Sequence, residues 1–385
     1  MLASTVSRLK CPKKKRGKTC DGQLELFADE TITIAEVQEV RTGRLECGRC
    51  KAKFPILAGV ALLVPDVRLF LLQHVKGISK TVADQEIPRE YRREFIAAKA
   101  QIETEHIEED LEAERVNALY LMNHYLRVHD SGSLKYPWWK PLSGAASPVI
   151  DCVVREYWDH GPFARIEQWI GRMAKKDSEG VCGALVELGC GVGGLYPVLK
   201  PFLSYYLGVD SSFSSIMLAR HFALGMPYAG SIGIPEDLLH GPVSREINLA
   251  PATPAGGQAD FVAGDLDALP VKSGEWDVSI ALNTIDMLER PSALPEIQRD
   301  LLADGAIAIQ SCPYIWHEAA ASQIREVLPS RISDSASAVE WLYEQAGFAM
   351  EERFHHVPWL FFKHVRQLEI YSVHMFLARK SRGNP

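Results

Sequence analysis

Apolar and polar positions follow different patterns along the chain, and the changes of pattern divide it into regions. Short apolar segments at residues 23–27 and 44–46 predict strands in a compact, β-rich module at 9–66. From residue 84 to 127, apolar residues recur at helical spacing among charged ones, which predicts helices. The stretch 134–148 is rich in Pro, Trp, Gly and Ser and is expected to form a loop.

Strands and helices alternate in the second half of the chain. A helix at 151–175 precedes the alternation, and apolar stretches at 354–362 and 368–379 predict two closing strands. The strands between them are expected at 184–188, 205–209, 259–263, 276–281 and 306–310. Strands that alternate with helices pair in parallel, so the pattern predicts an α/β fold with helices on both faces of the sheet.

The chain is therefore expected to have three parts. These are the module at 9–66, a helical region at 84–180 that caps the active site, and an α/β domain at 181–380. A length of 385 residues agrees with this division, because one hydrophobic core rarely organises so long a chain.

Charge and hydropathy restrict the partners and the location of the protein. A formal net charge of −7, with one short basic run at 10–18, argues against general nucleic-acid binding. No apolar run approaches the roughly 20 residues that span a bilayer, and the first residues lack the apolar block of a secretory signal. We expect a cytoplasmic protein without membrane contact. The sequence does not indicate its oligomeric state.

Half of the eight cysteines lie in the N-terminal module. Disulfides are not expected in a reducing compartment, so the cysteine spacing points to metal binding or packing. Four thiolates suit a structural Zn²⁺ ion, because they leave no open coordination position, and the predicted ligands are Cys11, Cys20, Cys47 and Cys50. The first pair is widely spaced, so four reduced cysteines without metal stay an alternative. The other four are expected to pack inside the fold: Cys152, Cys182, Cys190 and Cys312.

A glycine-rich turn follows the first strand of the α/β domain, in the sequence VELGCGVGG at 186–194. Glycine lets a backbone turn sharply and approach a ligand closely. Gly189, Gly191 and Gly193 are therefore expected to line a cofactor. The spacing of Gly189, Gly191 and Gly194 also fits the dinucleotide fingerprint, so NAD stays an alternative at this step.

Three acids at successive strand ends add to the glycine turn. Glu187 lies just before the glycines, where a carboxylate attracts a cationic ligand and repels a pyrophosphate. Asp210, followed by Ser211, ends the next strand and can accept hydrogen bonds from ribose hydroxyls. Asp265 ends a third strand and can accept from an adenine amino group, with Leu266 against the ring.

The loops after the fourth and fifth strands are expected to hold the substrate, because α/β sheets bind ligands at this edge. Asn283 and Asp286 can hydrogen-bond a nitrogen-rich molecule, and Asn283 is also placed near the cofactor. Tyr314 and Trp316 can supply aromatic walls. A helix cap at Asp286 and core packing of the two aromatic residues are the alternatives.

The glutamate, the glycines and the later acids together resemble the pattern of class I S-adenosylmethionine (SAM) dependent methyltransferases. This resemblance implies a Rossmann-like sheet and SAM as the cofactor. The Asn-Pro-Pro-Tyr arrangement of enzymes that methylate nucleobases and glutamine is not present.

A narrower resemblance is to the methyltransferase domain of ovothiol-type enzymes, which N-methylates the imidazole of a mercaptohistidine. Its motifs match the segments 283–286, 313–316, 120–125 and 357–360. The resemblance implies that His124 and Tyr125 lie near the acceptor. Where that family usually has Arg-Glu, this chain has Lys363-His364, so the expected substrate is the broader class of small imidazole- or amine-bearing metabolites.

The segment 54–65, FPILAGVALLVP, resembles the end of the small zinc-ribbon activator subunits of tRNA and protein methyltransferases. Those subunits bind and stabilise separate enzymes. The resemblance implies that this chain carries such a module fused to its own catalytic domain.

The sequence therefore predicts a SAM-dependent N-methyltransferase acting on a small molecule, with a structural zinc ion. One alternative is a methyltransferase of tRNA or protein that uses the activator-like module in cis. The other is a non-catalytic, SAM-binding interaction protein.

Overall fold

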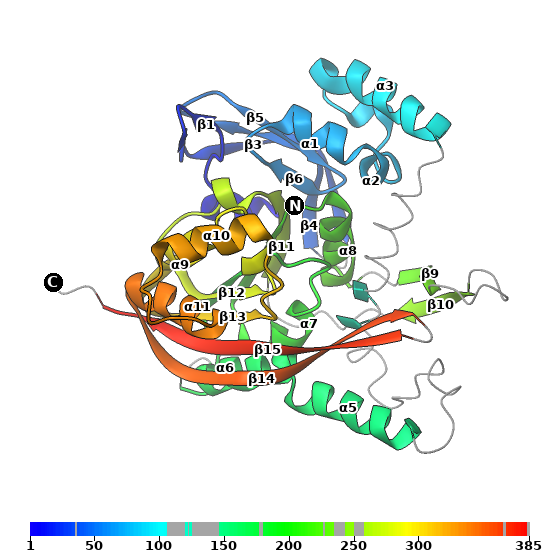
Figure 1. Ribbon diagram of the computed structural model, residues 1–385. Helices are drawn as coiled ribbons and strands as arrows, with labels where there is room; N and C mark the ends of the chain where they lie inside the picture. Colours follow the sequence, from blue (N-terminus) through cyan, green and yellow to red (C-terminus); the bar gives the residue numbers. More distant parts are fainter. Residues whose placement is uncertain are drawn as a thin grey trace.

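A single sheet of 11 strands runs through the computed structural model, in the order β14-β15-β13-β12-β7-β8-β11-β6-β5-β4-β3 (Figure 1). The structure describes residues 1–34, 37–105, 120–121, 123–124, 146–176, 180–225, 228–234, 243–249, 258–364 and 367–382. Within these residues, no helix has the length and apolar character needed to cross a bilayer.

The centre of the sheet is parallel. Its strands are β7 (Ala184–Leu188), β8 (Tyr205–Asp210), β11 (Gln258–Gly264), β12 (Trp276–Leu282) and β13 (Leu302–Cys312). Most of their residues are buried, which is why continuous apolar runs marked them in the sequence. The five predicted strands are confirmed, with small extensions at their ends.

An antiparallel hairpin closes one edge of this sheet. Its strands, β14 (Phe348–His364) and β15 (Gln367–Lys380), contain the two predicted closing strands, and β15 pairs with β13. Adjacent residues of a strand point to opposite faces of the sheet, and two such residues of β14 contact different helices. Glu352 accepts a hydrogen bond from Trp169 of α6 (Pro162–Ala174). Arg353 forms an ion pair with Glu340 of α11 (Ser335–Gln345). The sheet is therefore covered on both faces, as predicted.

The described residues form further α-helices. They are α1 (Val67–Gln73), α2 (Val75–Ser79), α3 (Arg89–Glu105), α5 (Ala146–His160), α7 (Tyr196–Leu199), α8 (Phe213–Ala223), α9 (Leu294–Leu301) and α10 (Glu318–Val327). A separate hairpin of β9 (Tyr228–Ile234) and β10 (Val243–Leu249) lies in the long insertion after β8.

Two boundaries in the helical region differ from the prediction. The single helix expected at 151–175 is two helices, α5 and α6, because Pro162 begins a new helix and a Cβ at Gly161 would lie 2.2 Å from the Tyr157 carbonyl oxygen. The loop expected at 134–148 ends earlier, since Pro148 lies in the first turn of α5, where its missing N–H costs no hydrogen bond. Residues 134–145 lie outside the described residues.

The N-terminal module forms the other edge of the sheet. β3 (Leu24–Ile34) and β4 (Val37–Cys47) contain the two predicted strands; β5 (Lys53–Leu57) and β6 (Val60–Leu63) were not predicted. A small ribbon of β1 (Lys14–Lys15) and β2 (Lys18–Thr19) lies beside them. β6 pairs in parallel with β11, with Leu62 opposite Ala263 and Leu63 opposite Gly264, so the two sheets are continuous.

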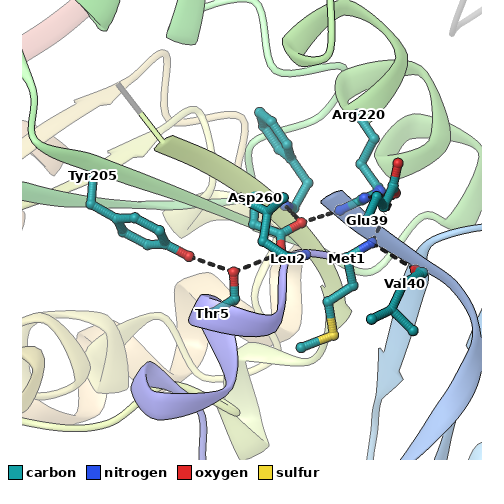
Figure 2. A network of polar contacts seen from close by, with 9 residues as sticks. Met1, Leu2, Thr5, Glu39, Val40, Tyr205, Arg220 and Asp260 are labelled. Atoms are coloured by element: carbon teal, nitrogen blue, oxygen red, sulfur yellow. Dashed lines mark hydrogen bonds and ion pairs between the residues drawn. The ribbon is translucent and has the colours of Figure 1, made fainter. Parts of the chain in front are cut away.

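A buried network of charged and polar groups joins the module to the central sheet (Figure 2). Arg220 of α8 donates to Glu39 of β4 and to Asp260 of β11. The amino group of Met1 donates to Glu39 at 2.8 Å, and the hydroxyl of Thr5 donates to Asp260 at 2.7 Å. Burial lowers the pKa of the Met1 amino group to about 4, so Arg220 is the cation that balances the two carboxylates. The module is therefore held to the sheet by polar contacts as well as by strand pairing.

Candidate active site

The predicted glycine turn follows β7 and has the backbone that only glycine adopts easily. Gly189, Gly191 and Gly193 have φ values of +73°, +51° and +72°. A Cβ at Gly189 would lie 2.6 Å from the hydroxyl of Thr284, which is itself bonded to the Leu188 carbonyl. At Gly191, by contrast, a Cβ would meet no atom of the described residues within 4 Å. The backbone at Gly191 is therefore open to a ligand.

Two carboxylates lie beside this turn. Glu187 is buried and accepts from the hydroxyl of Tyr206. Half-buried Asp210 accepts from the backbone N–H groups of Gly191 at 2.9 Å and Ser212 at 2.8 Å. Neither carboxylate forms an ion pair within the part of the chain that the structure describes. Two acids so close to an open backbone favour a positively charged ligand.

The pKa values of both acids reflect this uncompensated burial. Burial, together with the charge of Asp210, raises the pKa of Glu187 to about 8. Burial also raises the pKa of Asp210, although backbone N–H groups oppose the shift. A cation placed between the two groups would remove much of this penalty.

The third predicted acid lies at the same edge of the sheet. Ala263 of β11 is opposite Asp210 of β8, and Asp265 follows β11 directly. The Asp265 carboxylate accepts from the N–H of Asp267 at 2.9 Å and caps the short 3-10 helix at Leu266–Ala268. The acids Glu187, Asp210 and Asp265 thus end three neighbouring strands, as the sequence predicted.

The structure brings together the two predicted substrate segments. Asp286, which is buried, accepts from the N–H of Ile315 at 2.9 Å. Asn283 donates its N–H to the Ser311 carbonyl at 2.8 Å. The helix-cap alternative for Asp286 is wrong, because Thr284 holds the N-cap position of the 3-10 helix Ile285–Met287. Asp286 instead fixes one loop against the other.

Asn283 and Tyr314 have left-handed backbones, with φ values of +52° and +61°. This conformation is unfavourable for side chains other than glycine and often marks functional sites. Tyr314 stacks on Trp316, with ring centroids 5.5 Å apart and planes 15° apart. The Tyr314 hydroxyl is 2.7 Å from His374 Nδ1, and Trp316 Nε1 donates to Ser335 at 2.9 Å. The aromatic pair is therefore held rigidly beside the strained loop.

His124 packs on the glycine turn from a helical segment. A Cβ at Gly194 would lie 2.4 Å from the Cβ of His124. The imidazole lies among the rings of Tyr120, Phe163 and Trp359, at centroid distances of 5.4, 5.2 and 6.3 Å. Both ring nitrogens are buried and have no hydrogen-bond partner among the described residues. Burial lowers the pKa of His124 to about 4, so the ring is neutral. Tyr125 lies outside the described residues.

The four N-terminal cysteines converge, although their pairs are far apart in sequence. The Sγ atoms of Cys11 and Cys50 are 3.6 Å apart, those of Cys20 and Cys47 are 3.8 Å apart, and all four lie within 4.8 Å of one another. Zn–S bonds of about 2.3 Å in a tetrahedron place sulfur atoms about 3.8 Å apart. The four thiols therefore fit a structural zinc ion, which stays a prediction.

The packing prediction for the other cysteines is partly wrong. Cys190 and Cys312 are buried and Cys182 is half-buried, but Cys152 is exposed because it lies on the outer face of α5.

The sequence analysis also missed Tyr206, which holds Glu187, and His374, which holds Tyr314. The signal that could have found them is a side chain with a polar group inside a mainly apolar segment, as in YYLGV at 205–209 and VHMFLA at 373–378.

The parallel sheet with helices on both faces and a glycine turn at its edge is a Rossmann-like α/β fold. No protein-family model matches the chain, and no curated protein matches it. Among solved structures, it is similar to a magnesium protoporphyrin IX methyltransferase of Synechocystis PCC 6803 with bound SAM, at 16% identity over 69% of this chain and 97% of that chain, with a TM-score of 0.36.

Two further structures are similar. A complex that contains a methyltransferase activator of Haloferax volcanii is 14% identical over 61% of this chain and 96% of the matched chain, with a TM-score of 0.35. A SAM-dependent methyltransferase of Methanosarcina mazei is 13% identical over 52% of this chain and 92% of that chain, with a TM-score of 0.34.

Proposed function

We propose that this protein is a SAM-dependent methyltransferase that methylates a nitrogen of a small imidazole- or amine-bearing metabolite. The observation that carries the proposal is the pair of carboxylates, Glu187 and Asp210, beside an open glycine turn and without a cationic partner among the described residues. A ligand that is cationic near Glu187 and carries a ribose near Asp210 satisfies both. A dinucleotide would place its pyrophosphate near the carboxylate of Glu187, which disfavours NAD.

The residues present fit SAM, which supplies an activated methyl group on a sulfonium. Glu187 would bind the cationic amino-acid end, Asp210 and Ser211 the ribose, and Asp265 with Leu266 the adenine. Gly189, Gly191 and Gly193 would let the backbone approach the cofactor. Asn283 lies at the boundary between this site and the substrate loops.

On the acceptor side, the chain must orient a neutral nitrogen and exclude water. The stacked rings of Tyr314 and Trp316 would hold a flat, nitrogen-rich ring. His124 is neutral, and neither of its ring nitrogens has a partner among the described residues, so it would accept from or donate to the substrate. Asp286, already bonded to the Ile315 N–H, would set the loop geometry rather than remove a proton.

Calorimetry with SAM, on zinc-loaded protein, tests the cofactor; the absence of binding would end the proposal. Incubation with labelled SAM and a fractionated cell extract then tests the substrate. Label in the small-molecule fraction supports a metabolite methyltransferase, and label in the macromolecular fraction supports the tRNA or protein alternative. Binding without turnover on any fraction supports the non-catalytic alternative.

Gly191→Ala is expected to weaken SAM binding by about tenfold or more, equivalent to ~1.4 kcal/mol, because the new methyl group enters the open space at the turn. Gly274→Ala is the matched control: Gly274 also has a positive φ, +77°, and a Cβ there would meet no atom in the described part of the chain within 4 Å. Both variants should lose about 1–2 kcal/mol of stability from backbone strain. Equal SAM affinities of the two variants by calorimetry would contradict the placement of the cofactor.

SAM affinity is also expected to depend on pH through Glu187. Because its pKa is raised to about 8, the carboxyl is mostly protonated below that pH and cannot attract a cation. Affinity should therefore rise by about tenfold per pH unit as the pH increases toward 8, and then level off. Glu187→Gln should remove this rise in affinity. Any pH dependence that the variant still shows reports the titration of the amino group of SAM itself. Coincident profiles of the variant and the natural protein would argue against this role.

A further inference from the structure

A second group of metal-ligating side chains lies away from the cysteines, on the face of the sheet that α11 covers. Glu340 comes from α11, His355 from β14 and His374 from β15. Each residue offers one ligand atom, and these atoms all lie within 4.8 Å of one another. The three residues come from three different elements, so the tertiary fold itself brings them together.

A β-bulge in β14 places the first histidine. The pairing of β14 with β15 shifts between Phe354 and Val357, so that His355 and His356 both lie opposite His374. Bulges of this kind re-aim one side chain of a strand. The ring of His355 stacks on that of His374, with centroids 5.0 Å apart and planes 16° apart, whereas His356 bonds to Ser372 at 3.0 Å.

The other two residues are already oriented by outer partners. His374 Nδ1 is 2.7 Å from the Tyr314 hydroxyl, so its Nε2 faces Glu340, at 3.1 Å. The second oxygen of Glu340 is 2.9 Å from Arg353 Nε. Metal-binding histidines are commonly held in this way, with one ring nitrogen on a polar group and the other on the metal.

We propose that Glu340, His355 and His374 bind a divalent transition-metal ion. Two imidazoles and one carboxylate suit Zn²⁺, Co²⁺, Ni²⁺ or Fe²⁺. His374 is buried, Glu340 is half-buried and His355 is exposed, so the ion has a path from solvent. Three protein ligands leave positions for water, and the guanidinium of Arg353 weakens the attraction, so this site binds more weakly than four thiolates.

The proposed ion would also affect the substrate edge. Coordination through Nε2 requires the proton of His374 to stay on Nδ1, from which it donates to the Tyr314 oxygen. The ion would thus fix the ring of Tyr314, which stacks on Trp316 beside the strained loop. The metal site would therefore hold the aromatic ring of Tyr314 in place and would take no part in methyl transfer itself.

Cobalt binding to the full chain, first loaded with one equivalent of zinc so that only the tighter four-thiolate site is filled, tests the proposal. Unoccupied thiolates give Co²⁺ a strong thiolate charge-transfer absorption, and a histidine–carboxylate site does not. We expect one Co²⁺ ion per chain with d–d absorption and no thiolate band. His355→Ala should remove it, and His356→Ala, the matched control from the same bulge, should keep it.

Thermal unfolding with and without Co²⁺ gives a second measurement. Because an ion that binds only the folded state stabilises it, Co²⁺ should raise the melting temperature of the natural protein and of His356→Ala but not of His355→Ala. The proposal is overturned if the natural protein binds no ion outside the thiolates, or if the two histidine variants behave alike in both measurements. SAM binding plays no part in either measurement, so the proposed methyltransferase function is tested separately.

Discussion

Arg220→Met is expected to lower the free energy of unfolding by about 3–5 kcal/mol, because it leaves two buried carboxylates without a cation. The side chains of Arg220, Glu39 and Asp260 are 5%, 4% and 0% exposed. Burial raises the pKa of Asp260, but the guanidinium of Arg220, helped by hydrogen bonds from the Thr5 hydroxyl and the Leu2 N–H, holds it below its usual value. Denaturant unfolding, followed by circular dichroism, measures the loss.

An exposed ion pair supplies the control for Arg220→Met. Arg68 and Glu94 are 2.6 Å apart, but their side chains are 58% and 47% exposed. Arg68→Met should therefore cost no more than about 1 kcal/mol. If the two variants were equally stable, the network in Figure 2 would not be what holds the module to the sheet.

The strands of the central sheet were predictable because their environment is simple. A parallel strand covered by helices on both faces must be apolar along its whole length, and β7 matched its predicted range, 184–188. The acids at the ends of these strands were predictable for the same reason. Once the strands are parallel, residues that follow them must meet at one edge.

Features that depend on pairing between distant segments were not predictable. About half the length of the chain separates β6 from β11, and nothing in the sequence around Leu62 or Ala263 specifies that they pair. The network around Arg220 similarly joins residues at 39 and 260. Local sequence also gave no reason to expect that Asp286 would bond to the N–H of Ile315. Tertiary contacts assign such roles, and spacing along the chain cannot reveal them.

Removal of zinc is expected to have the largest effect on the protein as a whole. Structural zinc sites contribute about 10–16 kcal/mol of apparent binding free energy in small peptides, and here the ion would close the loops around β3 and β4. Cys47→Ser should therefore lose the metal, lower the melting temperature sharply and expose the module to proteolysis. Metal analysis, thermal unfolding and limited proteolysis measure these changes.

Zinc loss is expected to reach the cofactor site as well, although the cysteines do not contact it. β6 pairs with Ala263 and Gly264, and Asp265 is the next residue of the chain. If the module unfolds, this strand end loses its neighbour and Asp265 is no longer held in place, so SAM affinity should fall by about tenfold or more, ~1.4 kcal/mol. Cys152→Ser, which changes an exposed cysteine on α5, should alter neither metal content nor SAM binding. Unchanged SAM affinity in metal-free Cys47→Ser would mean that the central sheet orders the Asp265 loop without help from the module.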